Sequence, residues 1–460
     1  MGIEVRETNQ TKQLEMKLNS FTLLDRTAAL TELNERLKAD LVPDYPETVA
    51  LNVHAHSFYS YNAYGFSPSA LAWLAKKHGL SLVGIVDFDT LDGVDEFLNA
   101  CEALGVRGIA GMETRVFIPE FKGKEINSPG EPGVAYHMGT GFVCSDVPDP
   151  AKPGLADIRQ RAEARNRGIL EKVNKFLSPL SIDYEEDILP MTPAGYATER
   201  HMVQKIAEKA GQNFKDPAEF WAEKLDQSRE TLAKFMENPV GFQNLLRKKL
   251  MKRGGVAYVQ PDAGTFPSVD TFHAIVEAAE ALPCSAWLDG TSQGEQEIEA
   301  LLELLIAKGV SALNIVPDRN WNIQDPEVKA HKLKELYRIV ELAEKIDLPI
   351  LVGTEMNSPG QKLVDDFNAQ ELAPVKESFI KGAYVIYGHT RMQRLWGMGA
   401  RSAWGKQAFE VWQRRNNFYE RMGRLLPPEW KGDEVESWIH SGMNVDEVME
   451  SILKELRDKK

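Results

Sequence analysis

The chain has 460 residues, of which 43% are hydrophobic and 27% charged, and its formal net charge is −14. This length suits one large α/β domain with insertions, or two to three domains, and the composition is that of a globular protein. The acidic balance disfavours a nucleic-acid-binding protein, because duplex binding needs clustered Lys and Arg and the basic runs at 247–249 and 252–253 are short.

The first predicted element is a helical segment over residues 11–40. Apolar side chains recur there at helical spacing, at Leu14, Leu18, Phe21, Leu24, Leu30, Leu33 and Leu37. Pro43 and Pro46 end the pattern. We therefore expect residues 1–48 to form a helical N-terminal extension whose apolar stripe packs on the main body.

From residue 49 onward, short β-rich runs alternate with helical segments. Strands are predicted at residues 50–56, 82–88, 108–116, 134–143, 256–260, 285–288, 312–316, 349–353 and 383–387. Such alternation indicates parallel strands with covering helices. The number of units, eight or so, favours an α/β fold with a TIM-like barrel over an open doubly wound sheet, built from residues 49–154 and 252–395. A Rossmann fold is disfavoured, because no G-x-G-x-x-G follows the first strand.

Two further regions read as helical. Residues 155–251 are charged and include a helix start at Asp216-Pro217, so we expect a helical insertion between two barrel strands. Residues 396–460 are predicted to form a helical C-terminal extension with a final helix near residues 445–456.

Polar side chains follow or interrupt the predicted strands. His54 and His56 end the first strand, and residues two apart on a strand share a face. In parallel barrels, catalytic residues lie at the carboxyl ends of the strands. The side chains expected there also include Asp87, Glu113, His137, Arg319, Glu355 and His389. Imidazoles and carboxylates that converge are ligands for divalent transition metals, so the sequence predicts a metal site, with a buried hydrogen-bonded network as the alternative.

At these residues the sequence resembles the PHP family, named for polymerase and histidinol phosphatase. Seven motifs occur in order: His-Ala-His-Ser at 54–57, Gly-Ile-Val-Asp-Phe-Asp-Thr-Leu-Asp-Gly at 84–93, Gly-Met-Glu at 111–113, His-Met-Gly at 137–139, Tyr-Ala-Thr-Glu-Arg-His at 196–201, Gly-Gly-Val-Ala-Tyr-Val-Gln-Pro at 254–261 and Gly-Thr-Glu-Met-Asn at 353–357. The resemblance covers roughly residues 49–360. It implies a distorted seven-stranded barrel that holds up to three divalent metals and hydrolyses phosphate esters.

The chain departs from the family pattern where ligands of two of the three metals are expected. The positions that lack a good ligand are Asn62, Phe88, Gln260 and Asn357. The resemblance implies that one metal keeps its complete ligand set, His54, His56, Glu113 and Glu355. We therefore predict one divalent cation, Zn, Mn or Fe. A second ion bound through Glu113 and His137 is the alternative, with His137 as a ligand-orienting or substrate-binding residue if that ion is absent.

Other residues receive catalytic or substrate-binding roles. Asp87 is expected to orient a ligand histidine or to act as a general base. Arg200 is expected to bind phosphate or carboxylate as a bidentate fork, and His201 to donate a proton or contact the substrate, with exposed helix polarity as the alternative for this pair. The remaining predicted pocket residues are Asn62, Phe88, Gln260, Arg319, Asn357 and His389.

Together these residues predict a metal-dependent hydrolase of a small phosphorylated metabolite, in which metal-activated water attacks a phosphate ester. The reduced metal site leaves open a lyase, an isomerase or a hydrolase of a non-phosphate small molecule on a mononuclear site. A non-catalytic binding barrel is the least favoured reading.

The cysteine count and hydropathy predict the compartment. Cys101, Cys144 and Cys284 are far apart, which fits a reducing compartment rather than a disulfide framework. The N-terminal residues lack an apolar signal segment, and no window of about 18 apolar residues predicts a transmembrane helix. We expect a cytoplasmic protein with a small-molecule substrate and neither nucleic-acid nor membrane partners. The oligomeric state stays open.

Overall fold

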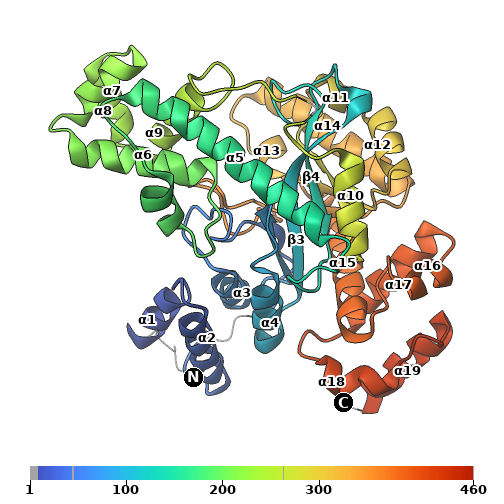
Figure 1. Cartoon of the computed structure of the whole chain (residues 1–460). Helices are drawn as coiled ribbons and strands as arrows, with labels where there is room; N and C mark the ends of the chain where they lie inside the picture. Colours follow the sequence, from blue (N-terminus) through green and yellow to red (C-terminus); the bar gives the residue numbers. More distant parts are fainter. Residues whose placement is uncertain (1–8, 44–45, 263, 459–460) are drawn as a thin grey trace.

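The computed structural model describes residues 9–43, 46–262 and 264–458, and a seven-stranded mixed sheet forms its centre (Figure 1). The strands are β1 (Leu51–Ala55), β2 (Leu82–Phe88), β3 (Gly108–Phe117), β4 (Val134–Thr140), β5 (Leu282–Trp287), β6 (Ala312–Ile315) and β7 (Ile350–Val352). Each strand pairs with the next one in the chain. An isolated bridge between Ala55 and Glu355 joins β1 to the residues after β7, so the sheet is nearly closed into a barrel, as predicted.

Gly353 allows the two ends of the sheet to meet. A Cβ atom on this residue would lie only 2.5 Å from the backbone nitrogen of His54. Beyond it, the Glu355 amide donates to the His54 carbonyl at 2.8 Å, and the His56 amide donates to the Glu355 carbonyl at 2.7 Å. The close approach that glycine permits therefore brings the segment after β7 beside the two histidines.

The prediction of uniformly parallel strands is wrong for β4. This strand runs antiparallel to both β3 and β5, whereas the other neighbouring pairs are parallel. The connection from β3 to β4 contains only the short turn η1 (Pro119–Phe121), not the helical crossover that joins parallel neighbours. The Ile118 amide donates to the Gly133 carbonyl at 2.8 Å and closes this return of the chain.

Helices cover the outside of the sheet. They are α3 (Pro68–Lys77), α4 (Val94–Leu104), α10 (Val269–Ala278), α11 (Gln293–Gln296), α12 (Ile298–Ala307), α13 (Asp318–Trp321), α14 (Pro326–Lys345) and α15 (Lys376–Trp396). Because the strands are enclosed, all residues of β1, β6 and β7 are buried.

Two predicted strands are absent. Residues 383–387 lie inside α15, a helix buried along its whole middle, where an apolar run has no polar side to reveal its period. Residues 256–260 form turns and irregular chain, and Val256 and Val259 are exposed, so no sheet neighbour covers this run.

The N-terminal segment forms two helices, α1 (Asn9–Lys17) and α2 (Leu23–Lys38), separated by residues 18–22. The buried side chains of the expected apolar stripe are Leu14, Leu18, Leu30 and Leu33, and these join the core of the barrel. Phe21 and Leu24 are 49% and 77% exposed, although the Phe21 ring packs edge-on against the buried Phe58 with centroids 5.6 Å apart.

A group of helices beside the barrel has an apolar core of its own (Figure 1). It consists of α5 (Lys152–Leu177), α6 (Glu199–Asn213), α7 (Pro217–Leu225), α8 (Arg229–Met236) and α9 (Pro239–Leu250), with the short turns η2 (Tyr184–Ile188) and η3 (Leu189–Met191). The Asp216 side chain accepts a hydrogen bond from the Glu219 amide, so the predicted helix start is confirmed. In Figure 1, α5 runs from this group back across the barrel.

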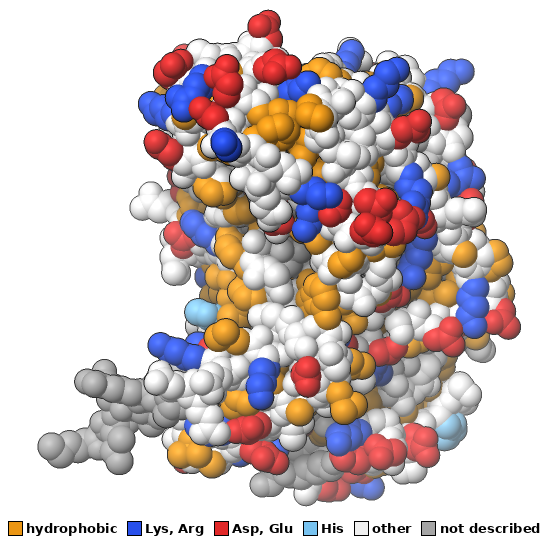
Figure 2. Space-filling view, turned by 60° about the vertical axis from the view of Figure 1, so that its left-hand side comes forward, with side chains coloured by type: hydrophobic (Ala, Val, Ile, Leu, Met, Phe, Trp, Pro, Cys, Tyr) orange, Lys and Arg blue, Asp and Glu red, His pale blue; other side chains and the backbone are white. Residues whose placement is uncertain are grey.

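The C-terminal part is helical, with α16 (Ala403–Ala408), α17 (Trp412–Leu425), α18 (Gly432–Val435), η4 (Glu436–Trp438) and α19 (Val445–Asp458). In the described part of the chain, no helix is long and apolar enough to cross a membrane. Figure 2 shows acidic and basic side chains interspersed over one face of the molecule.

Candidate metal centre

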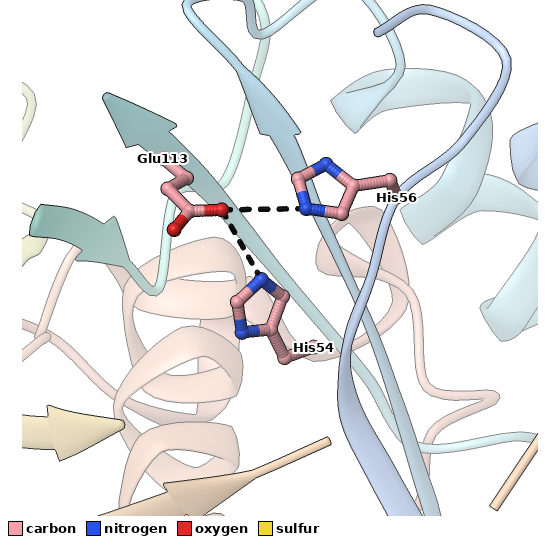
Figure 3. Close-up of side chains that lie close together, drawn as sticks. All are labelled: His54, His56 and Glu113. Carbon is pink, nitrogen blue, oxygen red and sulfur yellow. Dashed lines mark ion pairs between the residues drawn. The ribbon is translucent and has the colours of Figure 1, made fainter. Parts of the chain in front are cut away.

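Two imidazoles and one carboxylate meet inside the barrel (Figure 3). His54 lies in β1, His56 follows one residue after that strand, and Glu113 lies in β3. The distance from Glu113 Oε2 is 3.4 Å to His54 Nε2 and 3.3 Å to His56 Nε2. All three side chains are buried. Residues 54 and 56 share a face of the strand and the side chain of residue 113 points inward, so the three side chains form one cluster.

Each imidazole is oriented through its other nitrogen. His54 Nδ1 lies 2.9 Å from Asn314 Oδ1, and the Asn314 amide nitrogen is directed to the Leu351 carbonyl. His56 Nδ1 lies 3.1 Å from Ser60 Oγ, which donates to Asp87 Oδ1 at 2.7 Å. Both acceptors require a proton on Nδ1, so the Nε2 lone pairs point at Glu113.

This arrangement fits a divalent cation. Among the described residues, neither Nε2 atom nor Glu113 Oε2 has a hydrogen-bond donor, and all three atoms are buried. They lie within 4.8 Å of one another. Buried acceptors that face each other without a donor are costly, and a cation offsets that cost.

Glu355, the expected fourth ligand, is not part of this cluster. Its carboxylate accepts from Arg319 at 2.5 Å and from Gln361 at 3.3 Å, although it borders the same cavity. The guanidinium competes for the carboxylate and holds it away from the histidines. Three of the four predicted ligands therefore converge in this structure and Glu355 lies beside them, so the four-residue ligand set stays a prediction.

His137 is not a candidate ligand in this structure. Strand β4 pairs Met138 with Glu113 and places His137 opposite Thr114, so the side chains of residues 137 and 113 point to opposite faces. The His137 ring instead contacts His273 of α10, with 2.7 Å between their Nε2 atoms. Burial and the neighbouring His273 hold the pKa of His137 well below its ordinary value. The second ion that was considered as an alternative lacks this ligand.

Asp87 supports the cluster from behind. Its carboxylate accepts from the Ser57 amide at 2.8 Å, the Ser57 hydroxyl at 2.6 Å and the Ser60 hydroxyl at 2.7 Å. It is buried and does not border the cavity. This placement suits the orienting role that was considered for Asp87 and disfavours the role of general base, because a base must reach a substrate proton.

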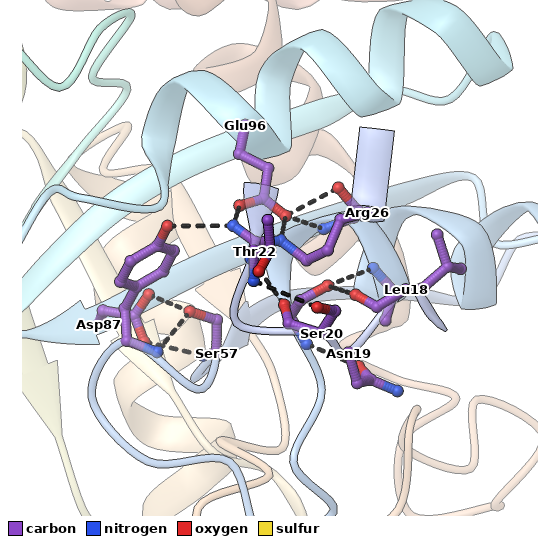
Figure 4. Close-up of polar contacts among 12 residues, drawn as sticks. Leu18, Asn19, Ser20, Thr22, Arg26, Ser57, Asp87 and Glu96 are labelled. Carbon is purple, nitrogen blue, oxygen red and sulfur yellow. Dashed lines mark hydrogen bonds and ion pairs between the residues drawn. The ribbon is translucent and has the colours of Figure 1, made fainter. Parts of the chain in front are cut away.

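The N-terminal helices are connected to this support (Figure 4). Arg26 of α2 is buried and binds Glu96 of α4 through two hydrogen bonds of 2.8 and 2.5 Å. Its guanidinium also donates to the Tyr59 hydroxyl at 3.2 Å, and the Tyr59 amide donates to the Ser57 hydroxyl at 3.2 Å. A polar path therefore runs from α2 to the loop that carries the Asp87 donors.

A cavity of about 540 Å³ lies next to the cluster. Of the predicted site residues, it is bordered by His54, Phe88, Glu113, Arg200, Arg319, Glu355 and Asn357. Phe88 stacks on the His56 ring with centroids 4.4 Å apart. The Arg200 guanidinium donates to Asn244 at 2.7 Å, and burial lowers the pKa of Arg200 to about 10.

Besides His56, Asp87 and His137, four predicted residues lie outside this cavity. Asn62 is buried and holds its own loop by donating to the His56 carbonyl and accepting from two backbone amides. Gln260 is exposed and donates to the Gly130 carbonyl, because the strand predicted to carry it is absent. These two residues stabilise loops and do not face the cavity.

The other two are buried histidines with structural contacts. His201 Nδ1 accepts from the Thr198 amide at 3.1 Å and caps α6, and burial lowers the pKa of His201 to about 3. His389 lies in α15 instead of at a strand end, where its Nδ1 accepts from the Ala400 amide at 2.9 Å. Neither imidazole reaches the cavity.

The sequence interpretation missed most of the basic residues that border the cavity. They are Arg115, Arg161, Arg165, Arg247, Lys248, Lys252 and Arg253. Arg115 lies two residues after Glu113 on the same strand, so its position could have been inferred. The others come from α5 and from the end of the helical group, and no local pattern predicts that they face the barrel.

Comparisons with known proteins give one family match and two structural neighbours of low identity. Residues 52–258 match the family model of the PHP domain. An amidohydrolase structure from Chromobacterium violaceum with bound sulfate is 16% identical with a TM-score of 0.48, covering 69% of this chain and 92% of its own. A structure from Bifidobacterium adolescentis, described as a candidate metal-dependent phosphoesterase, is 17% identical with a TM-score of 0.43, covering 73% and 98%. No curated protein matches this chain.

Proposed function

We propose, on the premise that this chain belongs to the PHP family, that it hydrolyses a phosphate ester of a small metabolite with the help of a divalent cation. The family match supports a metal-dependent hydrolase in general. The phosphate ester is the further step of the proposal. One observation carries it, the basic lining of the cavity beside the three candidate ligands.

This lining stands out against the charge of the whole chain. The net charge is −14, yet the cavity is bordered by nine Lys and Arg side chains and by five carboxylates, Asp89, Glu113, Glu131, Glu199 and Glu355. Clustered guanidinium groups bind phosphate through paired hydrogen bonds and are selected where anions are recognised. A basic cavity in an acidic protein therefore supports an anionic substrate.

His54, His56 and Glu113 would hold the cation, since they supply two imidazoles and a carboxylate from one buried cluster. Such a cation, when bound, lowers the pKa of water and polarises a substrate oxygen. Asn314 and Ser60 keep the two imidazoles in the required tautomer. Arg200 and Arg319 border the cavity and would orient the phosphate by charge-assisted hydrogen bonds.

A second candidate is a lyase, an isomerase or a hydrolase of a non-phosphate bond that uses a mononuclear site. Phe88 favours it, because an aromatic ring that stacks on His56 occupies a position where the family places a ligand. Phosphoryl transfer benefits from two metals that stabilise the attacking and the leaving oxygen together. A cluster of three ligand residues is compatible with chemistry that needs one ion.

Metal analysis followed by an activity panel tests the proposal. The purified wild-type protein should contain about one divalent ion per chain and Glu113→Gln should contain none, whereas Glu171→Gln, an exposed change on α5, should keep it. Wild type loaded with Zn, Mn or Fe should hydrolyse members of a phosphate-monoester panel. A metal-loaded protein that leaves every phosphate ester intact would refute the proposal in favour of the second candidate, and a chain without metal would refute both.

A further inference from the structure

The wall of the cavity contains a pair of arginines to which the proposed reaction assigns no individual role. Arg115 comes from β3 and Arg165 from α5. Their guanidinium carbons lie 4.3 and 5.0 Å from the centre of the same ring, Phe266, which is buried. The ring therefore holds two cations close to each other at the boundary of the cavity.

In the described part of the chain, Asp89 and Glu199 attract Arg165 only through space, without a contact ion pair. No hydrogen bond or ion pair joins its guanidinium to another residue, and its Nε atom is buried without an acceptor. Burial and the nearby Arg115 lower the pKa of Arg165. A guanidinium that is both desolvated and unpaired is costly to the folded protein, so its retention requires a compensating contact.

The carboxylates around this pair are already occupied. Glu131 accepts from Arg115 at 2.8 Å and from the Ser128 hydroxyl at 2.6 Å. Asp89 accepts from the hydroxyl groups of Thr114 and Tyr196.

A third carboxylate, Glu199, lies between two other cations, with Arg247 at 3.0 Å and Lys252 at 2.8 Å. None of these carboxylates therefore accepts a hydrogen bond from the Arg165 guanidinium, although Asp89 and Glu199 attract it through space.

We propose that Arg165 and Arg115 form a second anion-binding subsite, which accepts a phosphate or carboxylate group of the substrate that is distinct from the reacting group. Arg115 follows Glu113 by two residues on the same face of β3, so the subsite lies about 7 Å farther along the strand than the metal ligand. The substrate would then carry two anionic groups separated by a spacer that fits this distance. This inference deepens the proposed function and rests on it for the identity of the reacting group.

Anion binding to chelator-treated protein tests the subsite without relying on catalysis. Titration calorimetry with inorganic phosphate and, separately, with malonate should show binding to wild type. Arg165→Gln should weaken the binding of whichever anion wild type binds more tightly at least tenfold, and Arg165→Lys should weaken this binding less. Arg167→Gln is the matched control, because Arg167 lies on the same helix but pairs with Glu163 and Glu185. If wild type binds phosphate more tightly than malonate, the subsite accepts a phosphate group. If it binds malonate more tightly than phosphate, the subsite accepts a carboxylate group.

Thermal unfolding separates this role from a structural one. An arginine that stabilises the fold should lower the unfolding midpoint when it is replaced, whereas removal of an unpaired buried charge should leave the midpoint unchanged or raise it. We expect the second result for Arg165→Gln. A wild-type protein that binds neither anion, or an Arg165→Gln variant that binds as wild type does, would overturn the subsite. Because no metal is present, either result is independent of whether the loaded protein hydrolyses a phosphate ester.

Discussion

Ser60→Ala is the most direct test of how the metal ligands are oriented. The Ser60 side chain is fully buried between His56 and Asp87. It accepts from His56 Nδ1 at 3.1 Å and donates to Asp87 Oδ1 at 2.7 Å. Its replacement removes both contacts and leaves the His56 Nδ1 proton without an acceptor in a site that water does not reach.

The expected magnitude follows from this geometry. Loss of a residue that orients a metal-bound histidine typically costs ten- to a hundredfold in metal affinity, which corresponds to about 1.4 to 2.8 kcal/mol. A buried donor that loses its acceptor costs about 1 to 3 kcal/mol. The two estimates agree because the imidazole either rotates away from the cluster or stays in place with an unpaired proton.

The assay is a competition between the protein and a chromophoric chelator for Zn. Ser81→Ala is the matched control, because Ser81 is also buried and its hydroxyl donates to the Ala50 carbonyl at 3.1 Å, away from the cluster. We expect weaker binding for Ser60→Ala only. If the folded Ser60→Ala variant binds Zn within twofold of wild type, the proposed orientation of His56 is wrong.

Three further predictions concern residues around the site. His137→Asn should keep the full metal content that Glu113→Gln loses, as measured by elemental analysis, because His137 faces away from the cluster. Arg26→Met should lower the free energy of unfolding, measured in urea, by about 3 to 5 kcal/mol, because it leaves the buried Glu96 carboxylate without its cation. The double substitution Arg26→Met with Glu96→Gln should recover part of this loss. Burial lowers the pKa of His201 to about 3, so this imidazole stays neutral in the folded protein. In the unfolded chain it takes up a proton below about pH 6.5. The free energy of unfolding therefore falls as the pH falls toward 3, by about 2 kcal/mol at pH 5. His201→Gln should make the fall in unfolding free energy between pH 7 and 5 shallower, and an unchanged slope would contradict this assignment.

The strands that carry the site were predictable because their sequences are locally unambiguous. The run from Leu82 to Phe88 is predicted and observed as a strand with the same bounds. His54 and His56 share a face in any extended chain, so their convergence depends only on the strand. The ambiguous run at 383–387 was misassigned, because a fully buried helix and a buried strand show the same apolar pattern.

The residues that line the cavity depend on contacts between distant parts of the chain. Arg165 reaches the cavity because α5 runs back across the barrel. There Arg165 and Arg115 pack on the same ring, Phe266, which is distant from both of them in the sequence. Helical spacing places Arg165 on the same face of α5 as the buried Ala162 and Ile169, whereas Arg167 faces two carboxylates, but this spacing does not tell what covers that face. The packing of the helical group on the barrel determines which residues of α5 border the cavity.

The sequence by itself determined the barrel, the position of its first strands and the two histidines with Glu113 as candidate ligands, because these follow from local alternation and motif spacing. The tertiary structure alone decided the composition of the site. The antiparallel direction of β4 sets the register that turns His137 outward, and the position of Arg319 draws the Glu355 carboxylate away from the cluster. Register and ion pairing both arise between segments that are remote in the chain, so no window of sequence contains them.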